Sequence, residues 1–367
     1  RIIIPLSALT EMTDPANTPV TISKVDAAVE EIGMVLTIGR YANLTVKHPV
    51  FQTAIGLVAD AIRRIRDSRT NNVLLAAANV RYAGGAANRS TLTSGAVLTD
   101  TDIMVVTSDL EDERGAEHFY PKNELYAGVC DSKVKQDIRN ASNWRNANQY
   151  DNEALKRGTF GEWQGVMWHV SNFLPKFTNL ATTGMTFTMV SNGGGSITGT
   201  SYLKVVKIDE ARGFEEDITA EQTKTSLGAA QVLRVVLPTA ANHRFQLYAG
   251  TVSGTLYKVA TANIVTSVTI PFDDNQTVNI KTIPTTGDTA PVTPKSGVTV
   301  HRSYIFGKEA YGQVTLDANS LRPTLTSGEE TESNPLGLRR KIGAVITFKA
   351  FIINDDFFSA LESSSAF

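Results

Sequence analysis

The side chains that could do chemistry are few in this sequence, and they are widely spaced. Its single cysteine, Cys130, can form neither an intramolecular disulfide nor a cysteine-based zinc site. Its histidines lie more than 40 residues apart, so no two of them have the spacing of a helical metal site. They are His48, His118, His169, His243 and His301. We predict no metal centre, and we interpret each histidine as an incidental polar or core residue.

Motifs for nucleotide binding and nucleophilic catalysis are also missing. The sequence contains no GxxxxGK followed by Ser or Thr, and no GxSxG. The glycine triplet at 193–195 lacks the strand-to-helix context of a dinucleotide site and favours a hairpin turn. A hydrolase needs a nucleophile, a base and an orienting group, and no local signature supplies them. We therefore predict that the protein is not an enzyme and uses no cofactor.

Two groups of carboxylates could be mistaken for sites. Asp109, Glu111, Asp112 and Glu113 end an amphipathic pattern beside an arginine, which is typical of a solvated helix face. The Asp273–Asp274 pair could ligate calcium, but it lacks the spaced oxygen ligands and the terminal Glu of an EF-hand.

The densest basic cluster is Arg63, Arg64, Arg66 and Arg69. It could touch phosphate weakly, or it could be a helix surface that pairs with carboxylates of a neighbouring molecule. The net charge of -2 provides no overall field for a polyanion, so sequence-specific nucleic-acid binding is disfavoured.

Length and composition indicate a globular protein. With 367 residues, 42% hydrophobic and 20% charged, the chain suits two or three domains. No run of about 18 apolar residues occurs, and the opening lacks the order of a signal peptide. We expect neither export nor membrane insertion. The chain begins with Arg rather than Met, which fits either proteolytic processing or an omitted leader.

The first 75 residues predict an arm followed by a long helix. Residues 2–9 are apolar, 10–19 carry turn residues, and 20–38 return with neither face uniformly apolar. We expect a long hairpin that lies across another surface. From Pro49 to about residue 75, an apolar stripe predicts a helix of about 25 residues; its members are Phe51, Ile55, Val58, Ile62 and Ile65.

The next segment predicts an α+β core. Helices are expected over 99–115 and 131–141, the second capped by Asp131 or Ser132, with strands at 124–130 and 167–173. Trp163 and Trp168 are expected to anchor the core.

Residues 182–294 have a different character, rich in Thr, Ser, Val and Gly. Strands separated by turn signals predict an inserted all-β sandwich. They are expected at 185–191, 202–208, 231–237, 243–248, 256–260, 263–270 and 278–283. A closing strand over 339–353 has apolar residues on both faces, so we expect it to be buried on both over much of its length.

This order of elements resembles the Hong Kong 97-type fold of tailed-bacteriophage major capsid proteins, and most closely the capsid family of the N-four-like phages. The matching segments are PLSALTEMTDP, VRYAGGAANRS, GTFGEWQGVMWHVSNFLP, IFGKEAYGQVTL and SNPLGLRRKIGAVITFKAFIINDDFFSALES. Where the family commonly has Asp before the Pro-Leu pair, this chain has Asn334. The insertion, through SYLKVVKIDEARGFEED and HRFQLYAGTVSGTLYKVAT, resembles an immunoglobulin or fibronectin type III sandwich.

The resemblance implies an α+β fold with four parts. These are an extended-loop hairpin (1–42), a peripheral domain with a spine helix (43–100 and 336–367), an axial domain (101–181 and 295–335) and the inserted sandwich (182–294). It implies a protein that assembles with itself into pentamers and hexamers of an icosahedral phage head enclosing double-stranded DNA. Portal, scaffold and decoration proteins are further expected partners, DNA contact would be non-specific, and no membrane is involved. Assembly in the host cytoplasm would lead to the virion.

The residues that we expect at assembly contacts lie on the arm, the spine helix and the closing strand. They are Asp14, Lys24, Asp26, Glu30, Glu31, Arg63, Arg64, Arg66, Arg339 and Arg340. Some members of the fold cross-link through Lys and Asn, and Lys24 is a candidate in the right region.

Two other functions stay open. A phage surface or tail adhesin would explain the sandwich but not the long helix and the closing strand, and a hydrolase would need catalytic residues that the sequence does not place together.

Overall fold

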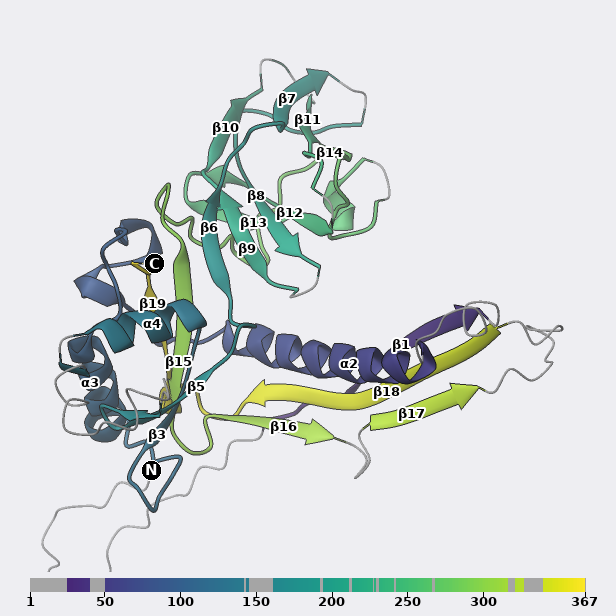
Figure 1. The fold of residues 1–367 in the computed structure, drawn as a ribbon. Helices are drawn as coiled ribbons and strands as arrows, with labels where there is room; N and C mark the ends of the chain where they lie inside the picture. The colour runs from purple at the N-terminus through teal and green to yellow at the C-terminus, as the bar shows by residue number, and fades with distance from the viewer. Residues whose placement is uncertain are drawn as a thin grey trace, which may run out of the picture.

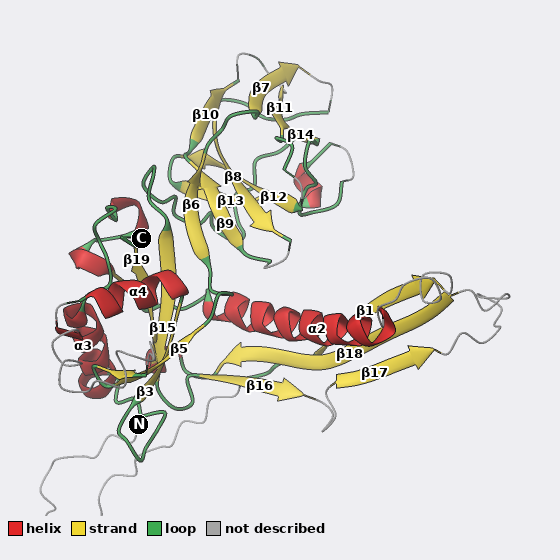
Figure 2. Cartoon of the chain, in the orientation of Figure 1, coloured by secondary structure: helices red, strands yellow, loops and turns green. Residues whose placement is uncertain are grey.

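The computed structural model describes residues 25–39, 50–141, 143–144, 161–191, 194–210, 213–226, 228, 231–240, 242–265, 268–315, 321–326 and 339–366. Strands outnumber helices in this part of the chain (Figure 2). One long helix lies along an elongated sheet, a body of helices and strands lies at one end of it, and a separate group of strands lies at the top of the view (Figure 1).

The elongated layer consists of one helix and four strands. Helix α2 (Val50–Leu74) covers a sheet in which β18 (Arg339–Ile352) is central. Strand β1 (Glu30–Gly39) pairs antiparallel with one edge of β18 over its full length. Strands β16 (Tyr311–Thr315) and β17 (Leu321–Thr326) pair with the other edge. The layer therefore joins segments from both ends of the described chain.

The spine helix forms where it was predicted, and the predicted stripe is confirmed at Val58 and Ile62 but wrong at Ile55. Ala54, Val58 and Ile62 recur every four residues and are buried against β18. Ile55, which the predicted stripe included, is 40% exposed. Seven residues turn a helix by about 700°, so Ile55 lies within about 20° of Ile62 around the helix axis, and its exposure is local rather than a change of the buried face.

The prediction that neither face of the arm is uniformly apolar is wrong for β1. Ile32, Met34, Leu36 and Ile38 alternate along one face, and three of them pack in the core beneath α2. Glu31, Gly33, Val35 and Thr37 are exposed on the opposite face. This alternation is the ordinary pattern of a half-buried strand, and the charged residues that precede it obscured it in the longer segment.

The closing strand was predicted to be buried on both faces, and this is wrong as well. One face of β18 is buried under α2; its members are Ile342, Ala344, Ile346, Phe348 and Ala350. On the other face, Val345, Thr347 and Phe351 are only half-buried. Both faces of β18 therefore carry apolar residues, but the chain itself buries only one of them fully.

The body confirms the predicted helices and strands of the core. Strand β3 (Tyr126–Cys130) runs parallel to β5 (Val166–Val170), which pairs with β4 (Glu162–Trp163). Strand β15 (Val300–Phe306) lies between β3 and β19 (Phe358–Ser363), and β2 (Val80–Tyr82) lies beside β19. Single 3₁₀ turns occur at Ala83–Gly85, Arg89–Thr91 and Asp355–Phe357.

Two helices pack against this sheet. Helix α3 (Asp100–Ser108) begins with a capping box between Thr99 and Asp102 and continues as a π-helical turn over Asp109–Glu113. Helix α4 (Ser132–Asn140) begins after Asp131 as predicted. Asp131 makes no side-chain capping hydrogen bond, because its carboxylate binds other groups. Trp168 is buried in the core between these elements, as predicted.

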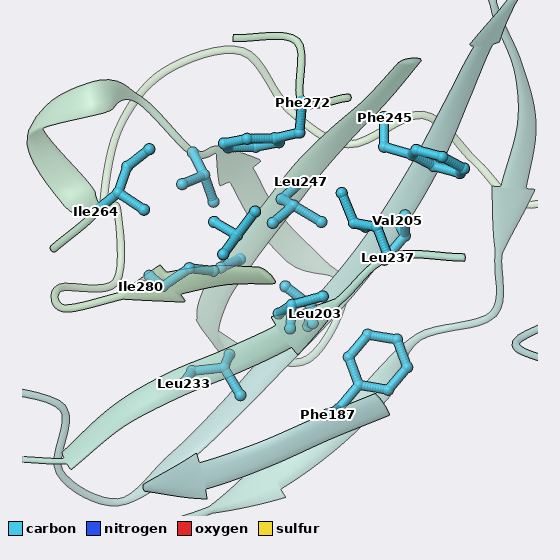
Figure 3. Close-up of a cluster of buried hydrophobic side chains, with 14 of the residues drawn as sticks. Phe187, Leu203, Val205, Leu233, Leu237, Phe245, Leu247, Ile264, Phe272 and Ile280 are labelled. Carbon is cyan, nitrogen blue, oxygen red and sulfur yellow. The ribbon is translucent and has the colours of Figure 1, made fainter. Parts of the chain in front are cut away.

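Residues 182–294 form a two-layer β-sandwich. One layer contains β7 (Thr186–Ser191), β11 (Gln231–Val236) and β14 (Thr277–Ile280). The other contains β8 (Thr200–Asp209), β9 (Glu215–Thr219), β10 (Gln222–Thr225), β12 (His243–Val252) and β13 (Thr255–Lys258). Apolar side chains from both layers fill the space between them, among them Phe187, Leu203, Leu233 and Leu247 (Figure 3).

Some strand predictions in this region are wrong. Residues 263–270 contain no strand in their described part; a 3₁₀ turn at Thr261–Asn263 is followed by a single bridge from Ile264 to Ile280. Strands β9 and β10 were missed, because EEDIT and QTKT are too polar to stand out. The likeness to an immunoglobulin domain and the four-part division of the chain stay predictions.

The sandwich and the body share one continuous sheet. Strand β6 (Lys176–Leu180) pairs with β15 on one side and with β9 on the other. Beside it lies a core to which both regions contribute, including Phe177 and Val300 from the body and Val206, Tyr248 and Leu256 from the sandwich.

Candidate assembly surface

An ionic contact at the start of β1 fastens the arm to the spine. The Lys349 ammonium of β18 donates a hydrogen bond to Glu30. The Arg69 guanidinium of α2 lies 3.8 Å from the other oxygen of the same carboxylate. The hydrogen bond and charge of Lys349 lower the pKa of Glu30. Glu30, which we expected at an assembly contact, therefore has partners on two elements of its own chain.

The basic cluster of α2 lies on the exposed side of the helix. The Arg64 guanidinium is 2.8 Å from Asp60, one turn earlier, and lies over the ring of Phe173. Arg63 and Arg66 are exposed, and neither pairs with a carboxylate among the described residues. These two side chains are the part of the cluster that is available to another molecule.

The remaining predicted contact residues are described only in part. Asp26 lies just before β1 and Glu31 lies within it, and both are exposed. Arg339 and Arg340 pair through their backbones with Gly39 and Ile38 at the far end of β1. Asp14 and Lys24 lie outside the described residues, as do the side chains of Arg339 and Arg340.

Exposed apolar side chains accompany these charges. Val35 is 65% exposed on the face of the sheet that α2 does not cover. Val314 of β16 is also exposed, and the pairing register places it on the same face. On α2 itself, Leu57 is 59% exposed and points away from the core. We call Val35, Val314 and Leu57 the apolar contact positions; they suit contact with another protein surface.

A buried cluster of three charges, which was not predicted from the sequence, lies in the body. Glu362 of β19 has no exposed surface and accepts hydrogen bonds from Arg89 at 2.8 and 2.5 Å. Arg302 of β15 donates to the same carboxylate at 3.4 Å. The Arg89 guanidinium also lies 3.6 Å from the ring centre of Phe177. The cluster fixes β19, β15 and β6 relative to one another.

A second buried group surrounds Asp131. Its Oδ2 lies 2.9 Å from Nδ1 of His301 and 3.0 Å from the Lys176 ammonium. Burial raises the pKa of Asp131, but the hydrogen bonds from His301 and Lys176 outweigh that effect and hold the pKa well below its usual range. The carboxylate is therefore charged at neutral pH. His301, interpreted as incidental from the sequence, is part of this group.

Neither buried group could be found from spacing alone. Arg89 and Glu362 are 273 residues apart, and Asp131 and His301 are 170 apart. The only local signal is a charged residue within an apolar strand, as at Arg302 in β15 and Glu362 in β19. Such residues are almost always paired when they are buried.

The described residues contain no group of three or more His, Cys, Asp or Glu that could hold a metal ion. Burial raises the pKa of Cys130 to about 12, so its thiol stays protonated and is a poor nucleophile. Asp273 lies near Arg244, and Asp274 accepts a hydrogen bond from the Ala240 amide.

Within the described ranges, no helix combines the length and the apolar character needed to cross a bilayer.

Comparisons with solved structures place this architecture among phage capsids. The capsid of cyanophage P-SCSP1u aligns with 98% of this chain and 80% of its own, with a TM-score of 0.50 and 10% identity. The capsid of Ralstonia phage GP4 aligns with 92% of this chain and 74% of its own (TM-score 0.49, 10% identity). The capsid of Helicobacter pylori bacteriophage KHP30 aligns with 92% of this chain and 76% of its own (TM-score 0.48, 9% identity).

No protein-family model and no curated protein matches the sequence. The fold relationship therefore rests on the cyanophage capsid, which aligns with nearly the whole chain. The described residues of this chain form the spine helix, the α+β body and the closing strand expected from the sequence. This chain has the α+β, Hong Kong 97-type fold of tailed-phage capsid proteins.

Proposed function

We propose that this chain is a major capsid protein that assembles into pentamers and hexamers of an icosahedral phage head enclosing double-stranded DNA. The observation that carries the proposal is the capsid fold over 98% of the chain. In this role the protein is structural rather than catalytic, and its main partner is another copy of itself.

The elongated layer supports this role. Helix α2 and the sheet beneath it extend away from the body (Figure 1). The layer exposes the apolar contact positions together with Arg63 and Arg66, which have no carboxylate partner in the described part of the chain. Exposed apolar residues bordered by charges are typical of a surface that another protein covers. Each copy contacts several neighbours in a shell, so individually weak contacts combine into a stable particle.

The remaining partners follow from the same proposal. Portal, scaffold and decoration proteins would bind the shell, packaged DNA would be contacted without sequence preference, and the virion head would be the final location. The acidic net charge of -2 agrees with DNA contact that is local and weak.

Electron microscopy tests the proposal directly. The full-length chain, expressed with its neighbouring genes, should form closed shells or rings of five and six subunits. Small uniform particles under every assembly condition would contradict the proposal and favour an adhesin or an enzyme, and ligand screening would then follow.

A pair of valine variants tests whether the elongated layer carries the contacts. Val35→Asp places a charge on the sheet face that α2 does not cover, and we expect at least a tenfold loss of particle yield with the subunit still folded. Val252→Asp is the matched control, since Val252 is 61% exposed at the end of β12 in the sandwich. Particle yield after size-exclusion chromatography is the measurement. Equal yields from the two variants would exclude Val35 from the contacts.

A further inference from the structure

A pocket in the body brings together basic and hydroxyl side chains from five segments of the chain. Its volume is about 340 Å³. Lys133 comes from the first turn of α4, Lys176 from β6 and His301 from β15. Ser364 follows β19, and Ser94 and Thr299 stand at the rim with exposed side chains. The pocket is thus built from elements that the core holds in place.

The charges around this pocket favour an anion. Lys133 is exposed and has no carboxylate partner among the described residues. Lys176 and His301 line the pocket, whereas the carboxylate that they share, Asp131, is 1% exposed and is not part of the lining. Two ammonium groups against one carboxylate leave a positive charge. The positive end of the α4 dipole, at Lys133, adds to it.

A buried hydroxyl in the pocket points to a missing hydrogen-bond partner. Ser364 is 2% exposed and lines the pocket, and its Oγ has no hydrogen-bond partner within the described part of the chain. Its backbone amide donates a hydrogen bond to the Ala96 carbonyl, and this bond fixes the position of the residue. A buried hydroxyl without a partner costs free energy, so a ligand oxygen that accepts its hydrogen would be bound favourably.

We propose that this pocket binds a phosphate-type oxyanion. Lys133 and Lys176 supply charge, and Ser364 donates a hydrogen bond from the floor. Rim hydroxyls at Ser94 and Thr299 are placed to hold further oxygens or water. The volume admits a phosphate with bound water or a phosphate that belongs to a larger molecule. The same chemistry fits free inorganic phosphate and the phosphodiester of a nucleic acid.

Isothermal titration calorimetry tests the proposal. Inorganic phosphate is titrated into the full-length subunit in a buffer that contains no phosphate. The wild type should show saturable binding at one site. Lys133→Gln should weaken it at least tenfold, and Ser364→Ala about threefold without lowering the unfolding midpoint. Lys122→Gln removes the same charge from an exposed turn outside the pocket and should leave binding unchanged.

Three results would overturn the proposal: no saturable binding by the wild type, equal losses in Lys133→Gln and Lys122→Gln, or unchanged binding in Ser364→Ala.

Competition with a mixed-sequence DNA duplex separates the two sources of the ligand, which are free phosphate and the phosphodiester of a nucleic acid. If a phosphodiester occupies the pocket, phosphate should compete with the duplex, and Lys133→Gln should bind DNA more weakly than Lys122→Gln does. If free phosphate is the ligand, the two variants should bind DNA equally. None of these measurements requires shell formation, so they can fail while the capsid proposal stands.

Discussion

Glu362 illustrates how strongly one buried charge constrains its surroundings. Among the described residues, its carboxylate is the only acidic group that binds Arg89 or Arg302. Nε and Nη2 of Arg302 have no hydrogen-bond partner in this part of the chain. Burying three charges is costly unless they neutralise one another. Loss of the acid would leave two guanidinium groups buried with the same sign.

We therefore expect Glu362→Gln to lower the free energy of unfolding by about 3 to 5 kcal/mol, the usual cost of breaking a buried ion pair. Urea unfolding followed by tryptophan fluorescence measures the change. The control is Glu117→Gln, because Glu117 pairs with Lys308 on the surface and its loss should have little effect. Similar midpoints for the two variants would show that the buried cluster does not stabilise the fold.

Asp131 should make stability depend on pH. Its pKa is lower in the folded protein than the value of about 3.9 expected in the unfolded chain, so its contribution is complete above about pH 4. That contribution is lost as the pH falls through the folded-state pKa. Asp131→Asn should therefore be less stable than the wild type by about 3 kcal/mol at pH 6, and the gap should narrow towards pH 2.

Unfolding curves at several pH values test this expectation. Asp60→Asn serves as the control, since Asp60 forms an exposed pair with Arg64 on α2. A gap between Asp131→Asn and the wild type that stays constant down to pH 2 would contradict the role given to the charged carboxylate.

At the scale of elements, α2 depends on the face that it buries. Ile62→Ala should lower the free energy of unfolding by about 2 to 5 kcal/mol, because Ile62 is buried between the helix and β18. Ile55→Ala, the same change at a position that is 40% exposed, should alter it by less than about 0.5 kcal/mol. Chemical denaturation of the two variants checks this. Equal effects would mean that Ile55 is buried as fully as Ile62.

The elements also show how far the sequence could predict this structure. The 25-residue α2, the capping of α3 by Thr99 and most strands of the sandwich follow from local pattern. The exposure of Ile55, the pairing of β1 with β18 and the polar β9 were not predictable, because they depend on partners far away in the chain. For the same reason, the sequence indicated the charged arm and helix but not the pocket beside Asp131.

At the scale of the whole molecule, the sandwich and the body should unfold together. Leu256 of β13 packs in the core that both regions share, so Leu256→Ala should destabilise both, by about 2 to 5 kcal/mol. We expect differential scanning calorimetry to show one transition that moves to lower temperature. Two transitions, of which only one moves, would show that residues 182–294 unfold independently of the body.

The central position of β18 has a mechanical consequence. The strand is about 46 Å long at 3.3 Å per residue, and α2 lies along it for about 37 Å. A pull on the arm along this axis would load the hydrogen bonds of β1 and β18 in shear, so that many must break at once, whereas a pull across the axis would open them one after another. The layer should therefore be stiff to stretching along its length and compliant to bending away from the helix, which suits a wall that must resist tension within its own plane.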